Sequence, residues 1–135
     1  MTAYAFEDQG TQHVIYIGQD LHINELWWSN NGWHRNDLTV AASAPLPSVD
    51  ESISAYAFED QGTQHVIYVG QDSHINELWW DSSGWHHNDL TVAASAPLPS
   101  INEGITAYAF EAQGTQHIIY VGQDLHINEL WWAPE

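Results

Sequence analysis

Short stretches of aromatic and β-branched residues, each ended by Gly, Asn or Asp, recur along the whole chain. In residues 3–7, small and aromatic side chains alternate with the two-residue period of a β-strand. Residues 13–17 are apolar on both faces, residues 23–28 end in two tryptophans, and residues 33–38 follow an Asn-Asn-Gly hairpin turn. No stretch keeps a 3.6-residue apolar period without a Gly, Pro or Asn interruption. The pattern therefore predicts four short strands in succession and disfavours helix.

This four-strand pattern repeats with a period of 52 residues. Residues 2–53 and 54–105 are identical at 42 of 52 positions, and residues 106–135 match the second copy at 23 of 30 positions. The third copy is partial and holds the first three strands. The two prolines within residues 39–48 predict an extended connector between repeats. Four-stranded units in tandem are typical of a β-propeller, in which each repeat forms one blade.

Closure of the ring requires more blades than this chain supplies. Strands that are apolar on both faces need cover on both faces, which radial stacking of blades provides. A propeller closes with about 4 to 8 blades, so we expect two chains to form a ring of six. The predicted fold is therefore an all-β β-propeller of four-stranded antiparallel blades, closed by homo-oligomerisation. A truncated or designed fragment, or another number of chains, is the alternative.

The charge of the chain excludes several classes of partner. Its net charge is -17, because Arg35 is the only Lys or Arg against 18 acidic residues. We expect no nucleic acid and no membrane surface as partner, since both are bound through cationic side chains. Eight Trp, six Tyr and three Phe provide enough apolar surface for a folded domain. The sequence contains neither cysteine, nor an apolar run of membrane-spanning length, nor a recognisable export signal, and it does not indicate a compartment.

Several short motifs recur in the blade repeats. They are HVIY from residue 13, INELWW from residue 23 and SNNGW from residue 29, with DSSGW from residue 81. These motifs resemble the blades of the fucose-binding β-propeller lectins of bacteria and fungi. The resemblance implies a sugar between neighbouring blades, held by an Arg of the second strand, a Glu of the third strand and stacking tryptophans. The family's Glu position is occupied by Glu25, Glu77 and Glu129, whereas its Arg position aligns with Val14, Val66 and Ile118.

The same residues suggest a ligand site on chemical grounds. Glu25 and Trp27 share one face of a strand, so each repeat places a carboxylate beside an indole. A carboxylate accepts hydrogen bonds from vicinal hydroxyls, and an aromatic face covers the C–H surface of a sugar ring. His13 could supply the donor that the missing Arg does not, while Trp28 is expected in the core. The candidate ligand-binding residues are Glu25, Glu77, Glu129, Trp27, Trp79, Trp131, Trp33, Trp85, His13, His65 and His117.

Structural roles remain open for these residues. Glu25 could instead cap backbone donors or pair with a histidine between blades, and His13 could be a hydrogen-bonded interior histidine. Metal binding is disfavoured because His22 and Glu25 lie three apart on a strand and hence on opposite faces. The residues that could contact a metal ion are His86, His87 and Asp89. We predict neither a metal site nor a cofactor.

Catalysis is also disfavoured by the sequence. Glycosidases need two carboxylates that face each other across a substrate, and turn geometry already accounts for Asp20 and Asp37. No GxSxG, phosphate-binding loop or HExxH motif occurs. We therefore predict a multivalent, non-enzymatic, lectin-like protein that binds a glycan, fucose-like or containing another monosaccharide. The alternative is a self-assembling repeat scaffold, natural or engineered, without a ligand.

Overall fold

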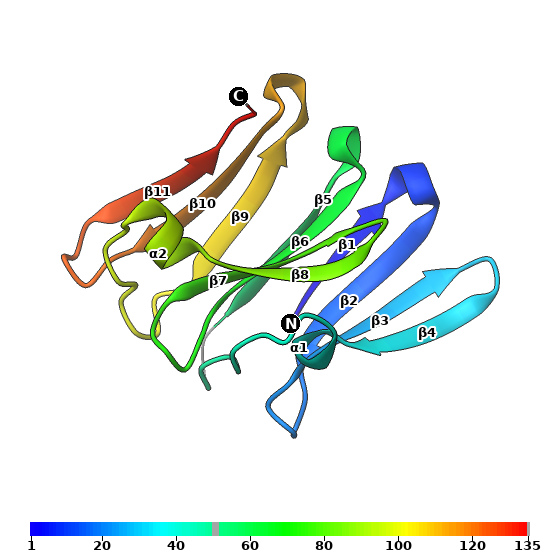
Figure 1. Cartoon of the computed structure of the whole chain (residues 1–135), viewed down its shortest axis with the longest axis horizontal. Coiled ribbons are helices and arrows are strands. Elements are labelled where there is room, and N and C mark those ends of the chain that lie inside the picture. Colours follow the sequence, from blue (N-terminus) through cyan, green and yellow to red (C-terminus); the bar gives the residue numbers. More distant parts are fainter. Residues whose placement is uncertain (50–51, 135) are drawn as a thin grey trace.

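Three antiparallel β-sheets follow one another along the chain in the computed structural model, which describes residues 1–49 and 52–134 (Figure 1). We call them the first, second and third blades. The first two have four strands each and the third has three, paired in chain order. The strands are β1 (Thr2–Phe6), β2 (Thr11–Ile17), β3 (Ile23–Ser29) and β4 (Gly32–Asp37); β5 (Ile53–Phe58), β6 (Thr63–Val69), β7 (Ile75–Asp81) and β8 (Gly84–Asp89); and β9 (Ile105–Phe110), β10 (Thr115–Val121) and β11 (Ile127–Trp132).

Strand register follows the predicted alternation. Ile15 pairs with Glu25, and His13 pairs with Trp27, so these four side chains lie on the same face of the first blade. The first strand is one residue shorter at its end than predicted, because Glu7 begins a short 3-10 turn, η1 (Glu7–Gln9). The equivalent turns η2 (Glu59–Gln61) and η3 (Glu111–Gln113) recur in the other blades. All three turns end at a glycine with positive φ, a conformation that suits glycine because it has no Cβ.

The connectors are not wholly extended, which corrects the sequence-based prediction. Each begins with a short helix, α1 (Leu38–Ala41) after the first blade and α2 (Leu90–Ala94) after the second. The side chains of Asp37 and Asp89 accept hydrogen bonds from the third residue beyond them and cap these helices. Beyond the helix the chain does extend, and Pro47 and Pro99 form isolated bridges to the next blade.

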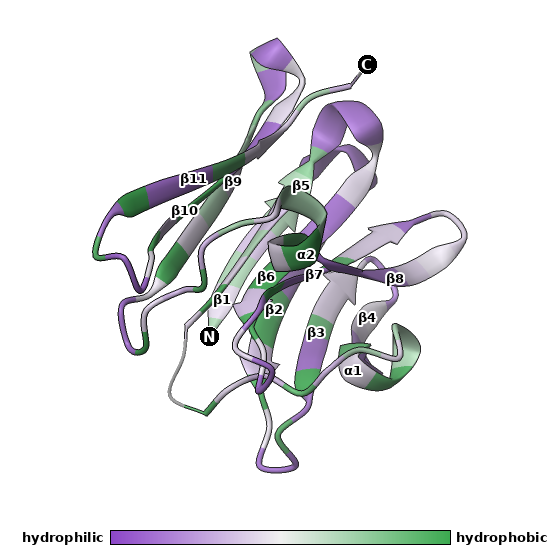
Figure 2. Ribbon diagram, turned by 60° about the vertical axis from the view of Figure 1, so that its left-hand side comes forward, coloured by the Kyte–Doolittle hydropathy of each residue, from purple (hydrophilic) through white to green (hydrophobic). Residues whose placement is uncertain are grey.

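The blades pack face to face, and β5 lies between β1 and β9 (Figure 1). Between the first two blades, Ile15, Ile23 and Leu38 pack against a surface that includes Val66 and Leu78. All five of these side chains are fully buried. Apolar segments lie along β2 and β6, and polar segments lie in the turns and on parts of β3, β8 and β11 (Figure 2). We call the surface with Ile15 the front face of a blade and the surface with Leu78 its back face.

Polar contacts at the two internal junctions are equivalent. Tyr4 donates a hydrogen bond to Gln64 at 2.6 Å, and Tyr56 donates to Gln116 at 2.7 Å. Burial raises the pKa of both tyrosines well above its ordinary value, with a smaller contribution from the nearby glutamates. The backbone N–H groups of Glu7 and Glu59 each donate to the glutamate one repeat further along, both at 2.7 Å. These contacts recur at both junctions, and the second junction adds hydrogen bonds from the N–H groups of Ile105 and Ala107 to the hydroxyls of Ser52 and Ser54.

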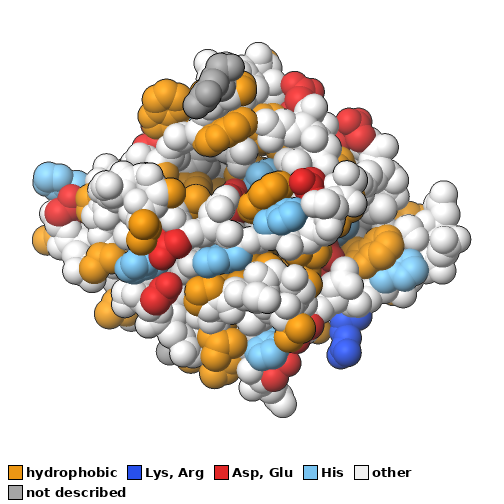
Figure 3. All heavy atoms as spheres, viewed as in Figure 1, with side chains coloured by type: hydrophobic (Ala, Val, Ile, Leu, Met, Phe, Trp, Pro, Cys, Tyr) orange, Lys and Arg blue, Asp and Glu red, His pale blue; other side chains and the backbone are white. Residues whose placement is uncertain are grey.

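The outer faces of the first and third blades are open. On the front face of the third blade, Ile127 is 79% exposed and Trp131 65% exposed. On the back face of the first blade, Trp33 is 61% exposed. Figure 3 shows apolar, acidic and histidine side chains interspersed over one side of the molecule, where the blue side chain is Arg35. No helix within residues 1–49 and 52–134 is long and apolar enough to cross a membrane.

Candidate functional site

A cavity opens at each junction between blades. The larger, about 520 Å³, lies between the second and third blades. The smaller, about 110 Å³, lies between the first and second blades. Trp85 of β8 lines the smaller cavity, whereas the third blade has no fourth strand in the described chain to narrow the larger one. The two cavities therefore occupy equivalent positions and differ in volume, because a fourth strand narrows only the smaller one.

A buried hydrogen-bonded array forms the floor of the smaller cavity. His13 Nδ1 lies 2.7 Å from Glu25 Oε2, and His13 Nε2 lies 2.8 Å from the hydroxyl of Thr11. Asn36 donates to the other carboxylate oxygen at 3.1 Å. Because an ionised carboxylate only accepts, the network assigns the proton of a neutral imidazole to Nδ1, and Thr11 then donates to Nε2. Glu25 thus pairs with a histidine, as the structural alternative expected, and this hydrogen-bonded, buried histidine belongs to the same blade as Glu25.

The array recurs in the other two blades. In the second blade, His65 lies 2.8 Å from both Glu77 and Thr63. In the third blade, His117 lies 3.1 Å from Glu129. The Glu129 side chain is 46% exposed, compared with 3% for Glu25, because no blade covers this front face in the single chain. The third array is therefore formed but open.

Aromatic rings make the side walls of the cavities. Trp27 stacks on His34 with ring centroids 4.0 Å apart, and Trp79 stacks on His86 at 4.2 Å. The indole N–H of Trp79 is buried and has no hydrogen-bond partner among the described residues. Because solvent does not reach this nitrogen, it does not face the cavity. Trp79 and Glu77 lie two residues apart on one face of β7, and both line the larger cavity.

The structure brings most of the predicted residues together. His13, Glu25, Trp27 and Trp85 line the smaller cavity. His65, Glu77, Trp79 and Trp131 line the larger one. Glu129 and His117 pair on the open front face of the third blade, and Trp33 lies exposed on the back face of the first.

Of the opposite wall of the cavities, sequence reasoning identified only Trp85. Trp80 and Gln64 line the smaller cavity from the back face of the second blade. Trp132 and Gln116 line the larger one in the same way. Tryptophans at this repeat position were expected in the core, as for Trp28. The recurrence of Gln on a largely apolar strand face was the signal that could have revealed this wall.

The register also explains which side chain replaces the arginine that the resemblance implies. Val14 lies on the opposite face of β2 from Glu25, because Ile15 is the residue that pairs with Glu25. Val66 is fully buried in the core between blades. In each blade the side chain that contacts the glutamate is therefore a histidine and not the aligned valine or isoleucine.

The three residues His86, His87 and Asp89 do not form a metal constellation. His86 contacts Asp81, His87 contacts Asn76, and Asp89 contacts His74. Adjacent strand residues point to opposite faces, so His86 and His87 diverge.

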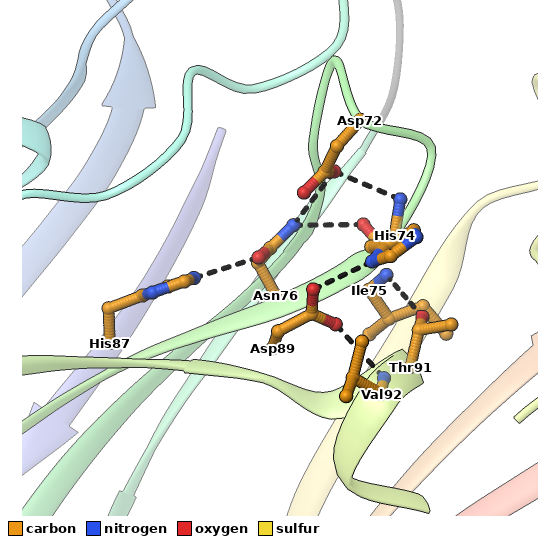
Figure 4. A network of polar contacts seen from close by, with 8 residues as sticks. All are labelled: Asp72, His74, Ile75, Asn76, His87, Asp89, Thr91 and Val92. Carbon is orange, nitrogen blue, oxygen red and sulfur yellow. Dashed lines mark hydrogen bonds and ion pairs between the residues drawn. The ribbon is translucent and has the colours of Figure 1, made fainter. Parts of the chain in front are cut away.

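Asp89 instead belongs to a polar network at the edge of the second blade (Figure 4). His74 Nδ1 lies 2.6 Å from Asp89, and this hydrogen bond raises the pKa of His74. Burial alone would raise the pKa of Asp89, but hydrogen bonds from His74 and Val92 hold it below its usual range. Asp72 completes a group whose polar atoms lie within 4.8 Å of one another, as Asp20, His22 and Asp37 do in the first blade. The network fixes the start of α2, whose Ala93 and Ala94 line the larger cavity.

Lectins are among the solved structures that superpose on this chain. A fucose lectin from Kordia zhangzhouensis in complex with methyl-fucoside superposes with a TM-score of 0.64 at 17% identity, over 93% of this chain and 85% of that one. SapL1 lectin in complex with α-methyl fucoside gives a TM-score of 0.74 at 20% identity, over 96% of this chain and 42% of that one. BP39L lectin from Burkholderia pseudomallei gives a TM-score of 0.70 at 19% identity, over 96% of this chain and 36% of that one.

The chain thus spans most of the Kordia lectin and about four tenths of the longer SapL1 and BP39L chains. No protein-family model and no curated protein matches the sequence. The shared arrangement of blades extends over more than nine tenths of this chain in all three superpositions. The chain has the fold of the fucose-binding β-propeller lectins.

Proposed function

We propose that the cavities between blades are carbohydrate-binding sites and that the protein acts as a multivalent lectin. The observation that carries this proposal is the larger cavity, where Glu77 and the ring of Trp79 share one wall and Trp132 lines the cavity from the next blade. A sugar hydroxyl can donate to the carboxylate, and an indole can cover the apolar side of the sugar ring. The structures of the Kordia and SapL1 lectins with methyl-fucoside support a monosaccharide ligand of this kind.

The chemistry of the cavities favours binding over hydrolysis. Each is lined by one carboxylate among the described residues, Glu25 in the smaller and Glu77 in the larger. Paired-acid glycoside hydrolysis uses two carboxyl groups on opposite sides of the scissile bond. Repetition of one site in successive blades suits a lectin, because linked weak sites can raise avidity by roughly 10²–10⁴.

The ring is proposed to close by association of two chains. At the internal junctions a tyrosine donates to the glutamine 60 residues further along, as Tyr56 does to Gln116. Continuing this register places the exposed Tyr108 of one chain against Gln12 of a second copy. The Glu111 N–H would in the same way meet the side chain of Glu7. The open front face of the third blade and the open back face of the first are therefore complementary, and their contact would cover Glu129 and complete a third site.

A glycan array tests the lectin proposal. The wild-type chain is compared with a triple variant, Glu25→Ala, Glu77→Ala and Glu129→Ala, and with the exposed-site control Glu103→Ala. We expect the wild type and the control to bind the same glycans and the triple variant to bind none. Circular dichroism and thermal unfolding of each variant distinguish loss of the site from loss of the fold. Unchanged glycan binding by a folded triple variant would contradict the proposal.

The alternative function, a self-assembling scaffold without a ligand, is favoured by the exposed apolar residues of the two outer faces. A stable oligomer that binds no glycan on the array would support this alternative. It shares the association step with the lectin proposal, so only the array separates the two.

A further inference from the structure

The only cationic Lys or Arg side chain of the protein lies on an open face. Arg35 stands alone in a chain of net charge -17. On β4 it pairs in register with Leu26 of β3, which places it on the back face of the first blade, and Trp33 shares this face. Arg35 is exposed, and within residues 1–49 and 52–134 no hydrogen bond or ion pair joins it to another residue. Its charge is therefore available to a second molecule.

The glutamate on the opposite open face has an unused acceptor oxygen. Glu129 contacts His117 through one carboxylate oxygen, at 3.1 Å, and its side chain is 46% exposed. In the other two blades, the second oxygen of the equivalent glutamate accepts from an asparagine of the fourth strand. The described part of the third blade has three strands and no such asparagine. Whatever charge His117 carries, Glu129 thus keeps an oxygen for a donor from outside the chain.

The internal junctions show where these two groups would meet. Trp85, on the back face of the second blade, lines the smaller cavity together with Glu25 of the first blade. Trp33 occupies the position of Trp85 one repeat earlier, and Arg35 follows it two residues later on the same face. A second copy docked in this register therefore brings Arg35 beside Glu129. Facing sheets lie about 10 Å apart, a separation that an arginine and a glutamate from opposite sheets can span together.

The third repeat departs from the other two at another position of the same junction. At the second internal junction, the N–H groups of Glu59 and Asp60 donate to the Glu111 carboxylate at 2.7 and 3.1 Å. In the third repeat Ala112 stands where Asp60 stands in the second. The Glu7 carboxylate of a second copy would therefore meet two N–H groups with one acidic side chain fewer beside them. This change lowers like-charge repulsion at the open end, as the arginine does on the opposite face.

We propose that a second copy of this chain docks on the open front face of the third blade through an ion pair between its Arg35 and Glu129, and that this pair selects which faces meet. The inference rests on the proposed closure of the ring and names the contact that fixes its register. Front-to-front docking would oppose two copies of Glu129, and back-to-back docking would oppose two copies of Arg35, at a cost in free energy. Only front-to-back docking pairs opposite charges, and a ring of two chains contains this contact twice.

Charge reversal at the two positions tests this contact. Sedimentation velocity over a range of concentrations measures the dimer dissociation constant of the wild type, Arg35→Glu, Glu129→Arg and the variant that carries both changes. We expect each single reversal to raise the dissociation constant at least about tenfold, because it places like charges at the junction. The double variant exchanges the two charges and should associate within about threefold of the wild type. Both side chains are exposed in the single chain, so all variants should fold, as circular dichroism would check.

Glu103→Arg is the matched control for net charge. Glu103 is exposed in the connector between the second and third blades, and its reversal makes the chain less negative by the same amount as Glu129→Arg. Long-range repulsion alone would make both variants associate more tightly than the wild type. The ion pair predicts instead that Glu129→Arg associates more weakly, whereas Glu103→Arg associates as tightly as the wild type or more tightly.

The outcomes separate the ion pair from the closure that it assumes. If the wild type stays monomeric at every concentration, both the ion pair and the ring closure are wrong. If the wild type associates and neither reversal weakens it, or if the double variant is no tighter than the single ones, the ion pair is wrong and the closure stands. Should a reversed chain fail to fold, Arg35→Gln and Glu129→Gln replace it, and each should raise the dissociation constant at least about threefold. Unchanged association of both glutamine variants would likewise overturn the ion pair.

Discussion

Replacement of one buried leucine tests how the blades are held together. Leu78 is fully buried between the first and second blades, where it packs in the same apolar cluster as Val66 and Ile15. Leu78→Ala would remove three carbon atoms and leave a cavity that the facing sheets cannot fully close. Such substitutions cost about 2–5 kcal/mol of unfolding free energy.

The repeat supplies a matched control for this experiment. Leu26 occupies the same position on the back face of the first blade, where the single chain leaves it partly exposed. Leu26→Ala should therefore cost less in the monomer, about 1–2 kcal/mol, since part of its apolar surface is already in contact with water. The cost should rise as protein concentration rises, because association covers this face.

Urea unfolding followed by tryptophan fluorescence measures both variants at low and high protein concentration. The reasoning predicts a large, concentration-independent loss for Leu78→Ala and a small loss for Leu26→Ala that grows with concentration. Equal losses for the two variants at every concentration would refute the assignment of one buried and one open back face.

Four further measurements test separate parts of the structure. Tyr56→Phe should lower the unfolding free energy by about 0.5–1.5 kcal/mol, because its internal hydrogen bond is lost, whereas Tyr108→Phe should leave the monomer unchanged and weaken association in sedimentation experiments. Asp89→Ala removes the cap of α2 and should lower the free energy of unfolding by about 1 kcal/mol in chemical denaturation. Unchanged stability of this variant would contradict the capping role. The hydrogen bond between His74 and Asp89 raises the pKa of His74 above 6.5 and lowers the pKa of Asp89 below 3.8. The pair therefore stabilises the fold fully between pH 3.8 and pH 6.5. This stabilisation declines as the pH falls through the lowered pKa of Asp89, and also as the pH rises through the raised pKa of His74. Thermal unfolding across pH should accordingly show the largest loss for His74→Ala at about pH 5–6 and a smaller one at about pH 9. Added salt should strengthen self-association by screening the net charge of -17, and weaker association at high salt would contradict this.

The strands and their repetition could be predicted from the sequence because side-chain alternation is a local property. Residues such as Ile15 and Glu25 have their orientation fixed by the two-residue period of a strand. The helices α1 and α2 could not be predicted in this way, since four or five residues are too few to show a helical period. Their capping residues, Asp37 and Asp89, were the only local signal, and a capping Asp serves turns equally well.

The site was predicted in part because only one of its walls is local. His13, Glu25 and Trp27 face one another across two paired strands, so their proximity follows from register. Trp80 reaches the same cavity from the next blade, and this contact depends on how the sheets stack. The pattern of one strand contains no information on which face meets the neighbouring blade. The identity of the opposite wall therefore required the three-dimensional structure.

The proposal that the junctions between blades bind glycans is tested most directly by the number of sites per chain. Calorimetric titration with the glycan that gives the strongest array signal measures this number for the wild type and for Glu77→Ala. The account predicts more than one equivalent site per chain and the loss of one site in the variant. A single site that Glu77→Ala leaves intact, or no binding heat with any glycan, would contradict it.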